Sequence, residues 1–84
     1  MGERPVSSVR TAEYDNLLTA LRQARSRANL TQRELSARLG RSASYIDKVE
    51  RGVRRLDVIE FLEICQVLRA NPHEVIDGLI NPLQ

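Results

Sequence analysis

The chain has 84 residues, a formal net charge of +2 and one cysteine. A chain of this length forms one small domain, and the single cysteine, Cys65, excludes an internal disulfide and a metal site built from several cysteines. No apolar run approaches the ~20 residues that a membrane-spanning helix requires. Because no segment resembles a secretion signal, we expect a cytoplasmic protein without a membrane partner.

The charges are divided unevenly along the chain. Residues 1–55 carry twelve basic and six acidic side chains, a balance of +6, whereas residues 56–84 carry one basic and five acidic side chains, a balance of −4. Such a division is typical of a protein that turns one surface towards a polyanion and keeps the rest away from it.

Helical periodicity dominates the sequence, and no stretch shows the period-two alternation of a strand. The sequence therefore predicts an all-α fold, a compact five-helix bundle with short connections. Residues 1–10 are predicted to be a flexible N-terminal arm, residues 11–80 the helical domain and residues 81–84 a C-terminal tail.

The first two helices have clear boundaries. The first is predicted from residue 11 or 12 to residue 28. The second has Thr31 as its N-cap, and Glu34 three residues later completes a capping box. Gly40 is a natural residue to follow its end, since glycine adopts the left-handed conformation without strain.

The third helix is predicted to take Ser42 as its cap and to end at Gly52. The fourth repeats the capping box, with Asp57 as the cap and Glu60 at the third helical position. Its apolar residues predict the face that packs on the core: Val58, Ile59, Leu62, Cys65 and Leu68.

The fifth helix is predicted to open with Asn71 as its cap, Pro72 at the first helical position and Glu74 at the third. Apolar residues of this helix and the tail are candidates for a homodimer interface, and completion of the core is the alternative. These residues are Val75, Ile76, Leu79, Ile80 and Leu83.

Residues 32–51 combine the features of a tight turn between two short helices. Gly40 permits a left-handed backbone and Ser36 permits close approach. Four apolar residues would fix the angle between the helices: Leu35, Leu39, Ile46 and Val49. The second helix of such a pair protrudes, and a protruding helix fits the ~12 Å wide major groove of DNA.

The segment LTQRELSARLGRSASYIDKVERG resembles the helix-turn-helix domain of phage lambda repressor and Cro, known as the XRE family. The resemblance extends over about residues 17–79 and implies a third helix that enters the major groove, usually in a dimer on a palindrome. It also implies that Gln32 contacts the DNA backbone and that Ala43, Ser44 and Lys48 touch base edges. Two residues depart from the family pattern: Arg41 occupies a usually apolar turn position, and Ala43 replaces a frequent glutamine.

The resemblance further implies a partly buried salt bridge between Arg25 and Glu50. On a helix of 3.6 residues per turn, Glu50 lies towards the core side set by Ile46 and Val49, which agrees with such a pair. On the same geometry an outward stripe is predicted, and it consists of Ser44, Lys48 and Arg51.

Asp47 and Tyr45 flank this stripe, one on each side. Asp47 is placed to pair with Arg51 four residues later. Tyr45 is expected either to contact a phosphate or to pack on the core, and Arg54 and Arg55 lie in a loop suited to phosphate. The full set of expected DNA-contacting residues is Gln32, Arg41, Ala43, Ser44, Tyr45, Asp47, Lys48, Arg51, Arg54 and Arg55.

Two functions from different classes are compatible with the sequence. The first is a transcriptional regulator, a repressor or autoregulator that binds a palindromic operator in double-stranded DNA as a homodimer. The alternative is an antitoxin-type interaction module that masks a small partner protein. No cofactor, metal or enzymatic activity is expected, because the sequence shows no nucleophile–base pair, carboxylate pair or metal-ligand cluster.

Overall fold

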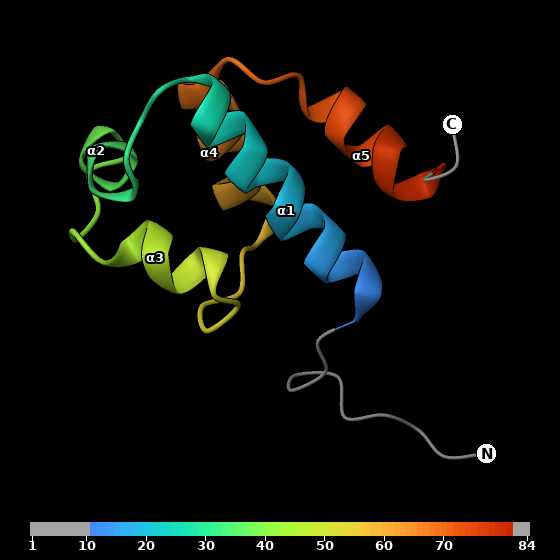
Figure 1. The fold of residues 1–84 in the computed structure, drawn as a ribbon, viewed down its shortest axis with the longest axis horizontal. Coiled ribbons are helices and arrows are strands. Elements are labelled where there is room, and N and C mark those ends of the chain that lie inside the picture. Colours follow the sequence, from blue (N-terminus) through green and yellow to red (C-terminus); the bar gives the residue numbers. More distant parts are fainter. Residues whose placement is uncertain (1–10, 82–84) are drawn as a thin grey trace.

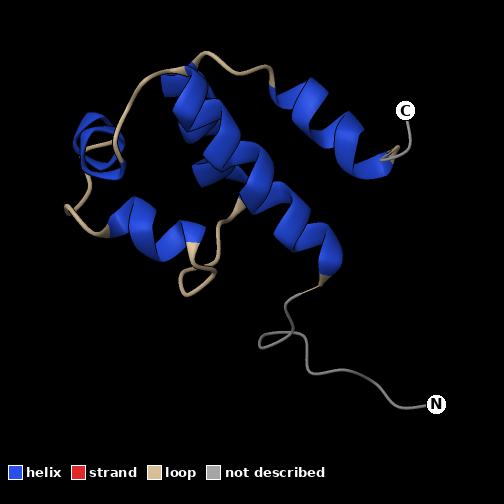
Figure 2. Cartoon of the chain, viewed as in Figure 1, coloured by secondary structure: helices blue, strands red, loops and turns tan. Residues whose placement is uncertain are grey.

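The computed structural model describes residues 11–81, which form five helices (Figure 1). They are α1 (Ala12–Arg27), α2 (Gln32–Arg38), α3 (Tyr45–Glu50), α4 (Val58–Leu68) and α5 (Pro72–Ile80). Figure 2 shows helices and loops but no strand in this range. The predicted all-α fold is confirmed, while the expected arm at residues 1–10 lies outside the described residues.

Side chains cap four of the five helices, largely as the sequence predicts. Thr31 and Asp57 each accept a hydrogen bond from the backbone N–H at the third helical position. The side chains of Glu34 and Glu60 accept one in return from the cap residue, which completes both capping boxes. Asn71 accepts instead from His73 N–H, at the second helical position of α5. The starts of α2, α4 and α5 are therefore fixed by bonds between residues two or three positions apart.

The start of α3 differs from the prediction. Ser42 is not its cap: the backbone carbonyl of Ser42 accepts from Tyr45 N–H at 3.0 Å and forms a turn before the helix. Ser44 occupies the N-cap position without a capping hydrogen bond from its side chain. Instead, the buried hydroxyl of Ser36 in α2 accepts from Ile46 N–H at 3.0 Å, so a neighbouring helix supplies the cap.

Two glycines bracket α3. Gly40 follows the C-cap of α2 with φ +70°, and Gly52 follows the C-cap of α3 with φ +77°. Residues with a Cβ are strained in this left-handed region. Both predicted helix ends are confirmed. The two turns determine how the chain leads into α3 and away from it.

The hydrophobic core is built from α1 to α4 and the turn before α2. Its buried apolar residues are Leu18, Leu21, Ala24, Leu30, Leu35, Tyr45, Ile46, Val49, Phe61, Ile64, Cys65 and Leu68. In α1, α3 and α4 these residues are spaced three or four apart, as amphipathic helices require, while α2 contributes Leu35 and the turn before it Leu30.

The predicted core face of α4 is wrong in three of its five positions. Val58 and Ile59 are 71% and 63% exposed, and Leu62 is exposed as well. The buried face instead follows Phe61, with Ile64, Cys65 and Leu68. Packing of α4 against α1 selects this face, and Val58 and Ile59 extend past the edge of the core.

Helix α5 lies beside α1 and forms the edge of the molecule (Figure 1). It has no buried residue. Val75 and Leu79 are half-buried, while Ile76 and Ile80 are exposed; Leu83 lies outside the described residues. A groove of about 800 Å³ is lined by α1, α5 and the segment that joins α4 to α5. Because only Val75 and Leu79 are half-buried among these apolar residues, α5 is attached to the core by one side.

Candidate nucleic-acid interface

Helix α3 is held by its inner face, and its outer face is exposed to solvent. Ile46 and Val49 are each 1% exposed, and Glu50 is buried beside them. Lys48 and Arg51 are exposed on the opposite side. Ala43 and Ser44 are also exposed, but they lie in the turn before α3 rather than on the helix.

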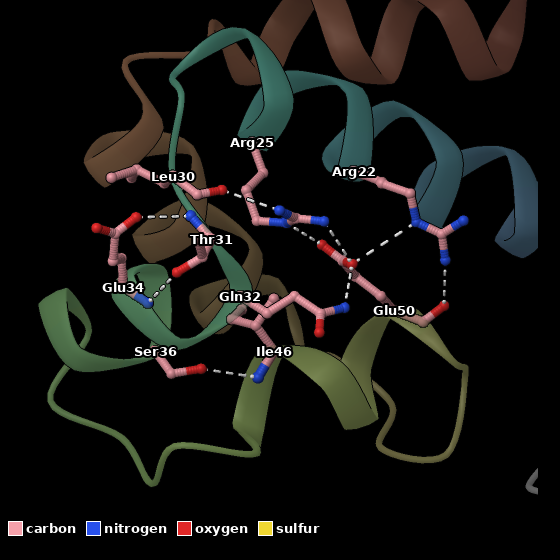
Figure 3. Close-up of polar contacts among 9 residues, drawn as sticks. All are labelled: Arg22, Arg25, Leu30, Thr31, Gln32, Glu34, Ser36, Ile46 and Glu50. Atoms are coloured by element: carbon pink, nitrogen blue, oxygen red, sulfur yellow. Dashed lines mark hydrogen bonds and ion pairs between the residues drawn. The ribbon is translucent and has the colours of Figure 1, made fainter.

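The predicted ion pair between Arg25 and Glu50 is confirmed and is bidentate (Figure 3). Arg25 Nε donates to Glu50 Oε2 at 2.7 Å, and Arg25 Nη2 donates to Glu50 Oε1 at 3.1 Å. A third donor of the same guanidinium, Nη1, bonds the Leu30 carbonyl at 2.9 Å. The Arg25 side chain is only 15% exposed, so it joins α1, α3 and the turn before α2 from within.

Two further residues bind Glu50 that sequence reasoning did not find. Gln32 Nε2 donates to Glu50 Oε1 at 2.7 Å. Arg22 Nη2 donates to the Glu50 carbonyl at 3.3 Å, and its Nε lies 3.6 Å from Oε1. Arg22 is three residues before Arg25 and therefore lies on the same face of the helix. This spacing could have indicated that Arg22 also reaches Glu50. A buried carboxylate requires several donors, and here it has them.

The half-buried position of Gln32 bears on its expected contact with the DNA backbone. The side chain is at the first position of α2, and its amide nitrogen is used by Glu50. Its amide oxygen accepts hydrogen bonds only. Any phosphate contact would therefore use the second N–H of the amide or the backbone of this helix start.

Asp47 and Arg51 form the predicted pair on the surface of α3. Arg51 Nε donates to Asp47 Oδ2 at 3.2 Å, and both side chains are solvent-accessible. The acid therefore lies beside the outward face and orients one of its two cations.

Two arginines from opposite ends of α3 meet at the start of α4. Arg54 donates to Glu60 through both terminal nitrogens, Nη1 at 3.4 Å and Nη2 in a short contact. Arg41 lies 3.6 Å from Glu60 and 3.7 Å from Glu63. Their guanidinium carbons lie 4.7 Å (Arg41) and 5.6 Å (Arg54) from the Tyr45 ring centre, within cation–π range. We call these five residues the Glu60 cluster.

Tyr45 adopts the second of its two expected roles and packs on the core, at 7% exposure. Burial raises the pKa of its hydroxyl, and the charge of Glu60 adds to this shift. The pKa of Glu60 is lowered, first by the hydrogen bond from the Asp57 backbone and then by Arg54. The hydrogen bond with Glu60 raises the pKa of Arg54, so the pair of Arg54 and Glu60 is ionised at neutral pH.

The loop after α3 is also tied to α1. The guanidinium of Arg55 lies over the Tyr14 ring at 4.2 Å, and the Tyr14 hydroxyl accepts from Leu56 N–H at 3.2 Å. Arg54 and Arg55 are exposed but held by protein groups, which sequence reasoning did not anticipate.

Residues 11–81 contain no grouping of three or more His, Cys, Asp or Glu side chains suited to a metal ion. Cys65 is buried, and burial raises the pKa of its thiol. None of the described helices is both long and apolar enough to cross a membrane.

A short helix that presents cations outward, preceded by a glycine turn and a second short helix, defines a helix-turn-helix domain. A family model described as "Helix-turn-helix domain" matches residues 16–76. An XRE-family like protein from Pseudomonas syringae pv. tomato is 44% identical, with 87% of this chain and 91% of that chain covered and a TM-score of 0.80. The chain belongs to the XRE-like helix-turn-helix family, a family of DNA-binding transcription regulators.

More distant structures share the fold. The clp gene regulator ClgR from Corynebacterium glutamicum is 25% identical, with a TM-score of 0.73 and coverage of 86% of this chain and 77% of that chain. The restriction-modification controller protein C.Esp1396I, as a tetramer with its natural 35 base-pair operator, is 19% identical, with a TM-score of 0.73 and coverage of 86% and 95%. No curated protein matches this chain.

Proposed function

We propose that the protein is a sequence-specific transcription regulator, a repressor or autoregulator, whose α3 enters the major groove of an operator. The observation that carries this proposal is the placement of α3. Its inner face is buried through Ile46, Val49 and Glu50, while Lys48 and Arg51 project from the outer face. A helix anchored in this way presents its cations in one orientation, so they can select a register on the duplex.

A homodimer on a palindrome fits the exposed apolar surface. Ile76 and Ile80 of α5 are exposed, as are Val58, Ile59 and Leu62 of α4. Apolar surface of this extent on so small a domain favours association, and a two-fold symmetric dimer would match an inverted repeat in DNA. Analytical ultracentrifugation tests this part: we expect a dimer at micromolar concentration that Ile76→Asp with Ile80→Asp converts to a monomer. A monomer in the wild type at high micromolar concentration would contradict it.

Selection from random duplexes tests the DNA-binding proposal. We expect an inverted repeat to be enriched and then to bind with an affinity that falls linearly with salt on logarithmic axes. Each phosphate contact contributes a slope of about −0.9. Lys48→Ala and Arg51→Ala should weaken binding, whereas Arg27→Ala, an exposed arginine on α1, serves as the matched control. An affinity that does not change between low and physiological salt would contradict the proposal.

An antitoxin-type module is the second candidate function. It is supported by the same exposed residues of α4, because a partner protein would cover Val58, Ile59 and Leu62. Purification from the native host distinguishes the two functions. A second small protein that copurifies in equal amounts, and is released by Ile59→Asp, would support the module.

A further inference from the structure

The guanidinium of Arg41 is held loosely by three neighbours in the Glu60 cluster. It lies over the Tyr45 ring, 3.6 Å from Glu60 Oε2 and 3.7 Å from Glu63 Oε1. Both N···O distances exceed the 2.7–3.2 Å range of ordinary hydrogen bonds. Arg41 is therefore attracted to its neighbours without being bonded in a fixed geometry to either carboxylate.

The two carboxylates differ in how firmly they are held. Glu60 has a 9% exposed side chain, accepts from the Asp57 backbone and from both terminal nitrogens of Arg54, and closes a capping box. The side chain of Glu63 is 51% exposed. The contact between Arg41 and Glu63 is thus the weaker one, since exposed ion pairs are readily exchanged.

Arg41 lies where a duplex would approach. It is in the turn directly before α3, two residues before the exposed Ala43. A phosphate group accepts two parallel hydrogen bonds from one guanidinium, which the loose geometry around Arg41 does not provide. A phosphate therefore offers this side chain better bonding than Glu63 does.

We propose that Glu63 competes with DNA phosphate for Arg41. In the free protein the guanidinium rests on Tyr45 between Glu60 and Glu63, and DNA binding transfers it from Glu63 to a phosphate. This inference rests on the proposed function. It makes Glu63 a positioning residue that lowers the affinity for any duplex, since its contact with Arg41 must be broken first.

The test compares Glu63→Gln with Glu74→Gln, a matched control on the first turn of α5. Both variants remove one negative charge, so both carry the same net charge. Binding of a selected operator and a scrambled duplex is measured by fluorescence anisotropy at one low salt concentration, with thermal melting as a check on folding. We expect Glu63→Gln to bind both duplexes about two- to five-fold more tightly than Glu74→Gln, the range of an exposed ion pair.

A double-mutant cycle with Arg41→Gln decides whether Glu63 acts through Arg41. We expect the gain from Glu63→Gln to disappear in the Arg41→Gln background, while the effect of Glu74→Gln stays the same in both. Equal effects of the two glutamine variants, or a gain that persists without Arg41, would overturn the inference. A wild type that binds no duplex in a salt-dependent manner would instead overturn the proposed function itself.

Discussion

Gln32 and Glu50 are hydrogen-bonded at 2.7 Å, which joins the first residue of α2 to the last residue of α3. The turn at Gly40 connects the opposite ends of these helices, where Ser36 Oγ also bonds Ile46 N–H. The two helices are therefore fastened at both ends (Figure 3). Their relative orientation, which sets how α3 projects from the surface, is held by side-chain bonds as well as by apolar packing.

Gln32→Ala should destabilise the fold by about 1.5–3 kcal/mol, the usual contribution of a hydrogen bond to a charged group. Urea unfolding measures this change. Arg33→Ala, an exposed neighbour on α2, is the control and should change the unfolding free energy by less than about 0.5 kcal/mol. If the two variants unfold alike, Gln32 contributes no stability through Glu50.

Arg25→Ala should be more damaging than Arg27→Ala. It removes both charge-assisted bonds to Glu50 and the bond to the Leu30 carbonyl, and it leaves a buried carboxylate with weaker partners. We expect a loss of about 2–4 kcal/mol, against about 0–1 kcal/mol for the exposed Arg27. Equal melting temperatures would show that the pair contributes nothing to the fold.

Ser36→Ala tests the cap that α2 supplies to α3. The variant leaves the buried N–H of Ile46 without its hydroxyl partner, at a cost of about 1–3 kcal/mol. Ser44→Ala is the matched serine control, since the Ser44 side chain makes no capping bond. A cost for Ser44→Ala that equals or exceeds that of Ser36→Ala would contradict the assignment.

The lowered pKa of Glu60 predicts how stability depends on pH. Its ordinary value is near 4.5, and the Asp57 backbone and Arg54 favour the ionised form in the folded protein. The stabilisation is therefore complete above this value and is lost as pH falls through the lower folded pKa. Glu60→Gln keeps a side chain that suits a capping box but does not titrate.

We accordingly expect Glu60→Gln to be less stable than the wild type at pH 7. Between pH 5 and pH 3 its unfolding free energy should decline less steeply. Chemical denaturation across this range measures both curves. Parallel curves would mean that other carboxylates account for the acid sensitivity.

Asp47→Ala should leave the fold intact, because Asp47 lies on the flank of α3 and pairs with the exposed Arg51. In the proposed complex, removal of an acid near phosphates should tighten binding to any duplex. Loss of the partner that orients Arg51 should weaken binding to the operator. A good base contact contributes about 1–3 kcal/mol and an exposed charge less than about 1 kcal/mol, so discrimination between operator and scrambled duplex should fall. Equal tightening on both duplexes would show that Asp47 does not orient Arg51.

The starts of α2, α4 and α5 could be predicted because their capping bonds are local. Thr31 and Asp57 bond to residues three positions away, and this spacing is visible in the sequence. The pair of Arg25 and Glu50 spans a longer distance and was found from the family resemblance together with the inward phase of Glu50. For Ser36 the sequence indicated only that a small residue permits close approach of the helices. The partner of its hydroxyl could not be predicted, because it depends on how α2 and α3 pack.

The exposed face of α4 could not be predicted from composition. Ile59 and Leu62 are as apolar as the buried Phe61 and Ile64, so hydrophobicity alone offers two overlapping faces. Contact with α1 chooses between them. Glu60 is buried where Arg41 and Arg54, from the turns before and after α3, meet the start of α4, and no local pattern connects these three residues.

The absence of any buried residue in α5 has a consequence for local stability. A helix of nine residues is too short to persist in water without tertiary contacts, and α5 is attached by one half-buried side. We therefore expect its amide protons to exchange with solvent through openings that leave α1 to α4 folded. If the proposed dimer covers Ile76 and Ile80, protection of these amides should rise with protein concentration, so that assembly and the last step of folding become one equilibrium.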